Sequence, residues 1–144
     1  MKNLVKDHRE KVAANMSVVA ELIQRRGDVH DITKLMSPEA ELAQAADKCL
    51  GPRKGLENRR GKCSHVDAFI TEHYRNPLNS HHPEHFENGV EDMNMIDMLE
   101  MLCDWRACCS GNFSDTLDRG FARFRVSGPL RSLMRKTCKE LGWL

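Results

Sequence analysis

The chain has 144 residues, with 22 lysines and arginines against 21 aspartates and glutamates, for a net charge of +1. This length suffices for one domain with a hydrophobic core. The balanced charge favours neither a nucleic-acid partner nor a membrane surface, and no apolar stretch approaches the ~20 residues that span a bilayer.

Cysteine usage and the N-terminus indicate a reducing compartment. The six cysteines show no CxxC pair and no regular spacing, and the N-terminal sequence MKNLVKDHREKV has no apolar signal core. We therefore expect reduced, mostly buried thiols and a cytoplasmic protein.

Helical periodicity runs through the chain. A first helix is predicted from about Asn3 to Arg26, with Gly27 as its stop. Its apolar residues have the three-to-four spacing of a buried stripe, on which His8 also falls; they are Val5, Val12, Met16, Val19 and Ile23. The sequence Ser37-Pro38-Glu39 predicts the start of a second helix, with Ser37 as N-cap, that ends near Leu50.

The rest of the chain is also predicted to be helical. Residues 51–62 are rich in glycine and basic side chains and indicate an exposed loop, or alternatively a basic lip for an anionic substrate. Further helices are predicted at 63–74, 94–109, 114–124 and 128–142, with a histidine-rich loop at 79–89. No alternation of period two indicates a strand. The predicted fold is all-α, a single compact helical bundle over residues 1–144.

Three carboxylates share one face of the most apolar predicted helix. Asp97, Glu100 and Asp104 lie at positions i, i+3 and i+7. Buried together they would repel one another and lose hydration, so they require protons or cations. Either this stripe faces solvent, or at least one member, with Asp104 favoured, binds a metal.

The order of His8, the pair His30-Asp31 and Asp104 along the chain reads H…HD…D. This pattern resembles the HD-domain superfamily, which comprises helical metal-dependent phosphohydrolases and their relatives. The resemblance covers about residues 3–110. It implies an HD-domain-like bundle in which these four side chains hold one divalent ion. The stretches HDITK, HHPEHF and EMLCDW are similar to an uncharacterised phage and bacterial family with an HD-like pattern. That similarity implies the bacterial host cytoplasm as the location of a phage-encoded protein.

Extra histidines between the HD pair and Asp104 suggest a second ion, as in superfamily members with additional histidines. His73 and His81 are the predicted ligands. Adjacent side chains do not easily share one ion, so His82 is predicted to contact substrate or a ligand. His65 and His85 are expected at the surface.

Other residues near these segments are candidates for the reaction. Lys34 is predicted to hold a phosphate oxygen or to pair with Asp31. Glu39 is predicted to orient the nucleophilic water, or to serve only the start of its helix. Arg75 and Arg106 are candidate phosphate contacts, with a solvated surface role as the alternative.

The expected function is that of a metal-dependent phosphohydrolase acting on a nucleotide or other small phosphate ester. One or two divalent ions (Mn, Co, Mg, Zn or Fe) would lower the pKa of a bound water, and Asp31 would bridge ions or accept the water's proton. We expect a small phosphate-containing substrate, no nucleic acid and no membrane, and a homo-oligomer stays open. The alternatives are an HD-like diiron oxygenase and a non-catalytic phage protein that binds a host partner.

Overall fold

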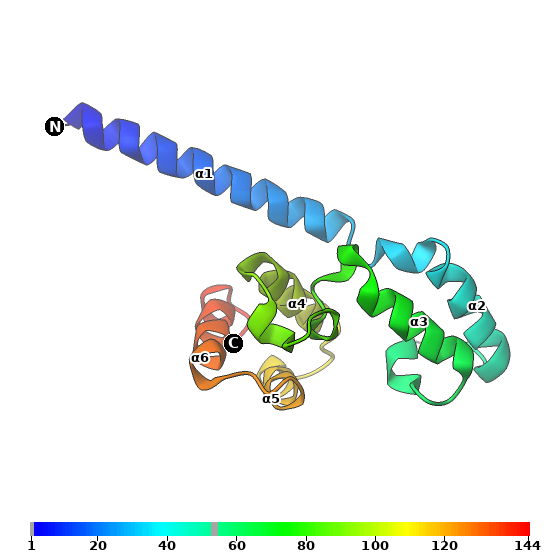
Figure 1. The fold of residues 1–144 in the computed structure, drawn as a ribbon. Coiled ribbons are helices and arrows are strands. Elements are labelled where there is room, and N and C mark those ends of the chain that lie inside the picture. The colour runs from blue at the N-terminus through cyan, green and yellow to red at the C-terminus, as the bar shows by residue number, and fades with distance from the viewer. Residues whose placement is uncertain (1, 53–54) are drawn as a thin grey trace. The chain divides into compact units, whose positions relative to one another are not determined.

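The computed structural model describes residues 2–52 and 55–144. Over these residues the fold is all-α, as the sequence predicts, and no strand is present (Figure 1). The chain divides into an N-terminal unit, Met1–His30, and a C-terminal unit, Asp31–Leu144. The single domain expected over residues 1–144 stays a prediction. Arg53 and Lys54 of the predicted basic loop lie outside the described residues.

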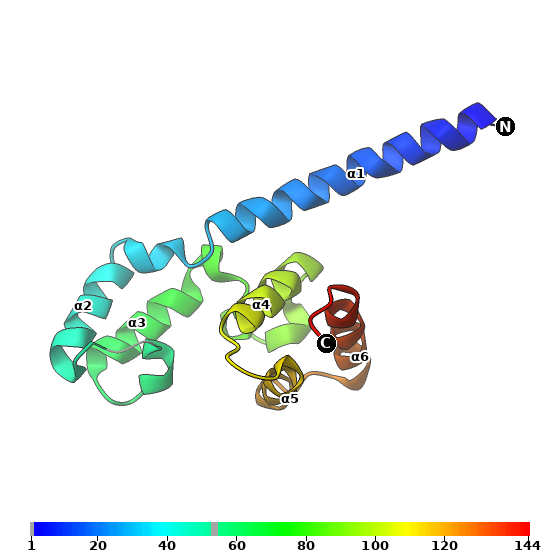
Figure 2. The same cartoon turned by 180° about the vertical axis from the view of Figure 1, so that it is seen from behind.

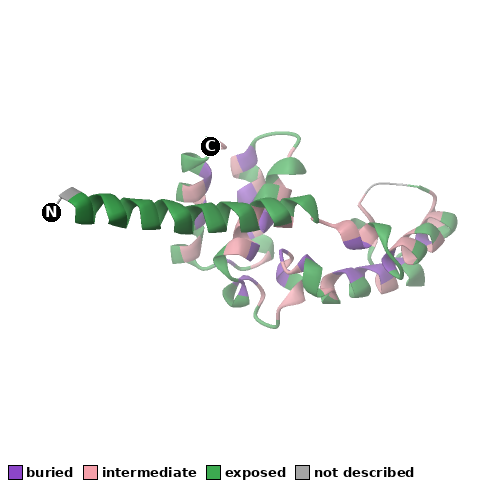
Figure 3. Cartoon of the chain, turned by 90° about the horizontal axis from the view of Figure 1, so that it is seen from above, coloured by how far each residue is buried: buried purple, intermediate pink, exposed green. Residues whose placement is uncertain are grey.

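The N-terminal unit is built on helix α1 (Lys2–Asp28), which continues past the predicted stop at Gly27. The stripe predicted to be buried is exposed at Val5, Val12, Met16 and Val19 (Figure 3). The spacing fixes which residues share a face, whereas the covering of that face depends on tertiary structure. Within residues 2–52 and 55–144, no helix combines the length and apolarity needed to cross a membrane.

The C-terminal unit begins with the 3-10 helix η1 (Ile32–Leu35) and a pair of α-helices, α2 (Glu39–Leu50) and α3 (Ser64–Arg75). The two α-helices lie side by side (Figures 1 and 2). Their contact buries a small apolar cluster made of Ala46, Val66, Phe69 and Ile70. The predicted N-cap Ser37 is wrong, because Pro38 occupies that position and the helix starts at Glu39.

The connection between α2 and α3 is more ordered than the loop predicted for residues 51–62. It contains the 3-10 helix η2 (Leu56–Arg59). The Arg59 guanidinium donates hydrogen bonds to the carbonyl oxygens of Leu50, at 2.8 Å, and Gly51, at 3.1 Å. Because these are carbonyls at the end of α2, Arg59 fastens the connection to that helix.

Three short 3-10 helices replace the histidine-rich loop predicted at 79–89. They are η3 (Pro77–Asn79), η4 (Pro83–His85) and η5 (Gly89–Asp92). A proline begins η3 and another begins η4, where its missing N–H costs no hydrogen bond. Consecutive turns of this kind redirect the backbone within a few residues, so side chains close in sequence can point into one space.

The last three helices form a second core. They are α4 (Met95–Ala107), α5 (Phe113–Arg123) and α6 (Gly128–Glu140). The N-cap of α4 is Asn94, which forms a capping box with Asp97, and the N-cap of α5 is Asn112, so α5 starts one residue before the predicted helix. The buried residues of this core are Val90, Met93, Met101, Leu102, Phe113, Leu117, Phe121, Val126, Met134 and Cys138.

Gly120 allows α5 to approach the indole of Trp105. A Cβ atom at position 120 would lie 2.4 Å from Cζ3 and from Cη2 of Trp105. The same indole stacks on Phe124, with ring centroids 5.9 Å apart and an interplanar angle of 13°. The close approach of α5 therefore fixes the position of Trp105.

Replacing Gly120 with alanine should destabilise the C-terminal unit. Alanine has the higher helix propensity by about 1 kcal/mol, but the overlap with Trp105 should cost about 1–3 kcal/mol. Urea denaturation followed by circular dichroism should show a lower free energy of unfolding. Gly111→Ala is the matched control, because nothing lies within 4 Å of its Cβ position. A Gly120→Ala protein as stable as this control would contradict the packing argument.

Candidate metal centre

Asp31 opens the C-terminal unit in a left-handed backbone conformation, with φ 55° and ψ 16°. Residues other than glycine, asparagine and aspartate rarely adopt this conformation, which costs roughly 1–2 kcal/mol. Asp31 lies at the N-cap position of η1, and its Oδ2 accepts a hydrogen bond from Lys34 Nζ at 2.8 Å. Strained backbone of this kind concentrates at functional sites.

Three histidines direct their Nε2 atoms toward the other oxygen of Asp31. The distances to Oδ1 are 3.4 Å from His73, 3.6 Å from His81 and 4.0 Å from His82. The Nε2 atoms of His73 and His82 are 2.9 Å apart. His73 lies in the last turn of α3, whereas His81 and His82 lie between η3 and η4. We call these four residues the Asp–His cluster.

Two buried carboxylates lie behind the cluster. His73 Nδ1 is 2.8 Å from Glu39 Oε2, and His81 Nδ1 is 3.1 Å from Glu100 Oε1. A carboxylate beside Nδ1 holds the proton of a neutral imidazole there and leaves the Nε2 lone pair facing the cluster. This is the arrangement in which histidine binds a metal ion.

A buried hydrogen-bond network fixes Glu39 and His73. The Thr33 hydroxyl donates to Glu39 Oε2 at 2.8 Å. The Asn79 amide donates to the Thr33 hydroxyl and to the His73 carbonyl oxygen, each at 2.9 Å. The network joins η1, α2, α3 and η3, so the orientation of His73 depends on four elements of the chain.

His82 is held in its neutral form. Burial and, after it, the neighbouring His81 and His73 together lower its pKa to about 3. A neutral imidazole keeps a lone pair on one ring nitrogen, so His82 is chemically suited to bind a cation near neutral pH. The adjacent rings of His81 and His82 have centroids 4.1 Å apart.

One oxygen of Asp31 and one nitrogen each of His81 and His82 lie within 4.8 Å of one another. Both histidines therefore lie within reach of the same place, and which of the two would bind an ion stays a prediction. The chain turns at His81 and bends at His82, so the two side chains are not spread as they are on a regular helix.

The acidic stripe predicted on α4 divides into three roles. Asp97 is buried, caps α4 with Asn94, and accepts a hydrogen bond from Ser80 Oγ at 2.6 Å. Glu100 is buried beside His81. Asp104 lines a cavity together with Asp31 and His82. The solvent-facing alternative is wrong for Asp97 and Glu100.

The cavity beside the Asp–His cluster has a volume of about 280 Å³. Its walls carry two cations, Lys34 and Arg123, and both are already paired with carboxylates. Lys34 Nζ is 2.8 Å from both Asp31 Oδ2 and Glu57 Oε1, and Arg123 is 2.7 Å from Glu84 Oε1. Burial opposes the charge of Lys34, but its hydrogen bonds to Asp31 and Glu57 outweigh burial and raise its pKa.

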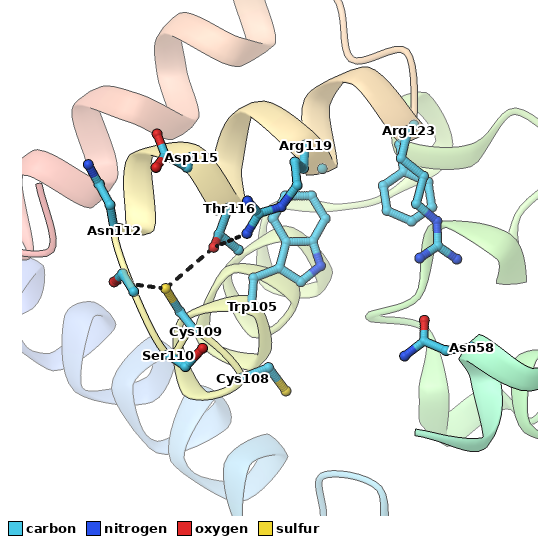
Figure 4. Close-up of a pocket in the computed structure, with 13 residues that line it drawn as sticks. Asn58, Trp105, Cys108, Cys109, Ser110, Asn112, Asp115, Thr116, Arg119 and Arg123 are labelled. Carbon is cyan, nitrogen blue, oxygen red and sulfur yellow. Dashed lines mark hydrogen bonds between the residues drawn. The ribbon is translucent and has the colours of Figure 1, made fainter. Parts of the chain in front are cut away.

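A larger cavity, of about 710 Å³, shares part of this wall (Figure 4). The residues common to both cavities are Asn58, Trp105, Cys108, Arg123 and Phe124. Beyond them the larger cavity is lined by polar side chains of α5, including Asp115, Thr116 and Arg119. The two cavities thus adjoin at this shared wall, and the smaller one is next to the Asp–His cluster.

Several predicted site residues lie elsewhere. Glu39 is buried behind His73, so it can orient that histidine but is not among the residues that line the cavity. Arg75 is exposed at the end of α3, and Arg106 is exposed with its guanidinium 5.6 Å from the Phe113 ring. Neither arginine lines the cavity.

His8 and His30 belong to the N-terminal unit, where His8 is exposed on α1. Their approach to Asp31 stays a prediction.

Glu100 and Arg123 lie beside the site but were not among the site residues predicted from the sequence. The sequence placed Glu100 in the acidic stripe. Its contact with His81 could not be predicted, because the two residues are too far apart in sequence for a local pattern to link them. Arg123 lies 39 positions after Glu84, its partner across the cavity. A contact over such a distance can be read only from the folded chain.

Comparison with known proteins gives one match. Residues 1–142 match the model of DUF5662, described as a family of unknown function. No curated protein and no solved structure matches the chain.

Replacing Thr33 with valine should test the network behind the cluster. Valine keeps the shape but removes the hydroxyl that bonds Glu39 and Asn79, which should cost about 1–3 kcal/mol of folding free energy. Chemical denaturation measures this change. Thr71→Val is the control, because that exposed hydroxyl bonds only the carbonyl of its own helix. Equal free energies of unfolding for the two variants would mean that the buried network contributes little to the stability of the fold.

Proposed function

We propose that this chain, which belongs to DUF5662, is a metal-dependent phosphohydrolase acting on a nucleotide or other small phosphate ester. The observation that carries the proposal is the convergence of three histidine Nε2 atoms on one oxygen of Asp31.

A cation resolves the electrostatics of the Asp–His cluster. Glu39 and Glu100 favour a proton on Nδ1 of His73 and His81, so that two Nε2 lone pairs face an anionic oxygen. Lone pairs and a carboxylate repel one another in a buried site, and a bound cation turns that repulsion into attraction. The competing arrangement has no ion and carries protonated imidazoles between the carboxylates.

The spacing of the cluster also suits a metal ion. Ligand atoms about 2.0–2.2 Å from one ion, at angles near 90–110°, lie roughly 3.0–3.5 Å from each other. The Nε2 atoms of His73 and His82 are 2.9 Å apart, and the Nε2 atoms of His73, His81 and His82 lie 3.4, 3.6 and 4.0 Å from Asp31 Oδ1, so small side-chain shifts would bring these atoms around one ion. Imidazole with carboxylate favours Zn, Mn, Fe or Co over Mg, which prefers oxygen ligands.

The smaller cavity supplies the groups that a phosphate ester needs. A divalent ion in the cluster would supply a water of lowered pKa and neutralise phosphate charge. Lys34 and Arg123 line the same cavity and would bind the non-bridging phosphate oxygens. Asp31 is held by Lys34 through Oδ2, so its Oδ1 stays directed toward the histidines.

The larger cavity favours an ester with a ring system. The stacked pair of Trp105 and Phe124 forms part of the wall shared by both cavities, and Arg119 and Thr116 lie beyond it. Aromatic faces with hydrogen-bonding side chains are the usual surroundings of a nucleobase. A phosphate at the cluster would leave the rest of a nucleotide in this larger space.

Glu39→Gln should weaken metal binding without creating a cavity behind His73. The amide keeps the size of the side chain but removes the charge that orients His73, which should lower affinity for Zn²⁺ or Co²⁺ about 10- to 100-fold. Isothermal titration of chelator-treated protein gives the affinities, and the visible spectrum of Co²⁺ reports coordination. Glu41→Gln, exposed on the same helix, is the matched control and should bind as the wild type does. Unchanged affinity in Glu39→Gln would contradict the role of Glu39 in orienting a metal-bound His73.

Asp31→Asn should abolish phosphate release while the helical circular dichroism stays near that of the wild type. The change removes the negative charge at the centre of the cluster, and the loss should be 10-fold or more. The assay uses a panel of nucleoside phosphates and sugar phosphates with Mn²⁺, Co²⁺, Mg²⁺, Zn²⁺ or anaerobic Fe²⁺. Asp118→Asn, an exposed residue that pairs with Arg135, should keep full activity.

Two results would redirect the proposal. If the wild-type protein binds metal but releases no phosphate from any substrate, the proposed hydrolase activity is wrong and the proposed metal centre still stands. If the protein binds none of these ions, the hydrolase activity and the metal centre are both wrong, and the ion-free cluster with protonated histidines is favoured.

A further inference from the structure

Three charged side chains of α5 line the larger cavity at intervals of about one helical turn. They are Asp115, Arg119 and Arg123, at positions i, i+4 and i+8 (Figure 4). Residues four apart on a helix lie on one face, with Cβ atoms about 5–6 Å from each other. One wall of the cavity of about 710 Å³ therefore carries a carboxylate followed by two guanidinium groups.

The guanidinium of Arg119 is oriented by its neighbour Thr116. Arg119 Nη2 donates a hydrogen bond to Thr116 Oγ1 at 3.0 Å, and the Thr116 hydroxyl donates to Cys109 Sγ at 3.3 Å (Figure 4). No ion pair joins Arg119 to Asp115 within residues 2–52 and 55–144. Because a guanidinium has five N–H donors, Arg119 is held in place and still has donors for a ligand.

Asp115 supplies the complementary group. It lies in the first turn of α5 and is exposed at the cavity. An ionised carboxylate accepts hydrogen bonds and donates none. Trp105 lines the same cavity and is fixed by its stacking on Phe124. The cavity thus combines a fork of donors, a pair of acceptors one turn away, and an aromatic side chain.

These three groups match one nucleobase better than the others. Guanine has two neighbouring acceptors, O6 and N7, which suit the parallel donors of a guanidinium. Its N1–H and its 2-amino group are two neighbouring donors, which suit the two oxygens of a carboxylate. Adenine carries an amino group where guanine has O6, so it would direct a donor at the guanidinium.

We propose that the larger cavity selects guanine, with Arg119 binding O6 and N7, Asp115 binding N1–H and the 2-amino group, and Trp105 supplying aromatic surface. This inference rests on the proposed function, since it names the base of the nucleotide that would be hydrolysed. Recognition of the base itself needs neither metal nor phosphate, because none of these three residues belongs to the Asp–His cluster.

The test uses nucleosides, which carry no phosphate, and the full chain without added metal. The chain has two tryptophans, whose indole N–H groups can be followed separately by NMR. Trp105 lines the cavity, whereas Trp143 lines neither cavity and packs against the Phe113 ring. Guanosine should shift the Trp105 signal in a saturable way and leave the Trp143 signal unchanged. A Trp143→Phe variant assigns the two signals.

Other nucleosides test the same contacts in the unaltered protein. Inosine keeps O6 and N7 but lacks the 2-amino group that Asp115 would bind. Adenosine lacks O6 as well as the N1–H donor. Each should bind about 5-fold or more weakly than guanosine, because each loses part of a paired contact to a base edge.

Two variants assign the contacts to residues. Asp115→Asn replaces an acceptor oxygen by a donor amide, which suits the 2-carbonyl of xanthine, so the ratio of guanosine to xanthosine affinity should fall about 5-fold or more. Arg119→Gln should weaken guanosine and inosine alike, because both carry O6 and N7. Asp118→Asn is the matched control, because Asp118 lies on the same helix, pairs with Arg135 and lines neither cavity. It should bind guanosine as the wild type does.

Three outcomes would overturn the inference. They are no saturable shift of the Trp105 signal with guanosine, equal affinities for guanosine and adenosine, and an unchanged preference in Asp115→Asn. Nucleoside binding is measured without metal or turnover, so each outcome is distinct from a failure to release phosphate. If the protein binds guanosine selectively but releases no phosphate, the guanine site stands and the hydrolase activity is wrong.

Discussion

The contact between His73 and Glu39 governs the geometry of the candidate site. Both side chains are buried, 34 positions apart in sequence, and 2.8 Å apart in space. A buried carboxylate is costly unless it is compensated, and here the imidazole and the Thr33 hydroxyl compensate it. The contact fixes η1 and α2 against α3, and it turns the second nitrogen of His73 toward Asp31. The positions of the other site residues follow from this arrangement.

Two apolar cores flank the polar network within the C-terminal unit. The core of α2 and α3 lies on one side, and the core of α4, α5 and α6 on the other. Residues 77–92 connect them through short 3-10 helices. His81 beside Glu100, and Ser80 bonded to Asp97, attach this connection to α4. Hydrogen bonds and ion pairs therefore hold the site in place between the two apolar cores. Functional sites often depart from ideal apolar packing in this way.

The sequence predicted where the helices lie because their apolar spacing is a local signal, but α1 continues past the predicted stop at Gly27 and its apolar face is exposed. It also predicted Asp31, His73 and His81 as metal ligands, and both histidines lie near Asp31 Oδ1; that they bind a metal stays a prediction. It could not identify Glu39 as the partner of His73, because nothing local joins positions 39 and 73. It gave no sign that His81 and His82 both lie near Asp31, because the turn at His81 changes the side-chain directions expected on a regular helix. The errors concern tertiary pairing and non-helical backbone, where residue spacing carries little information.

The charges around the small cavity determine the order in which ligands can bind. Lys34 is shared by Asp31 and Glu57, and Arg123 is paired with Glu84. These carboxylates outnumber the two cations, so the cavity without an ion repels a phosphate group. A divalent ion in the Asp–His cluster would reverse that balance, after which phosphate oxygens could displace Glu57 and Glu84 from the two cations. Metal binding would therefore have to precede phosphate binding, and the affinity for phosphate would come chiefly from the ion rather than from Lys34 and Arg123.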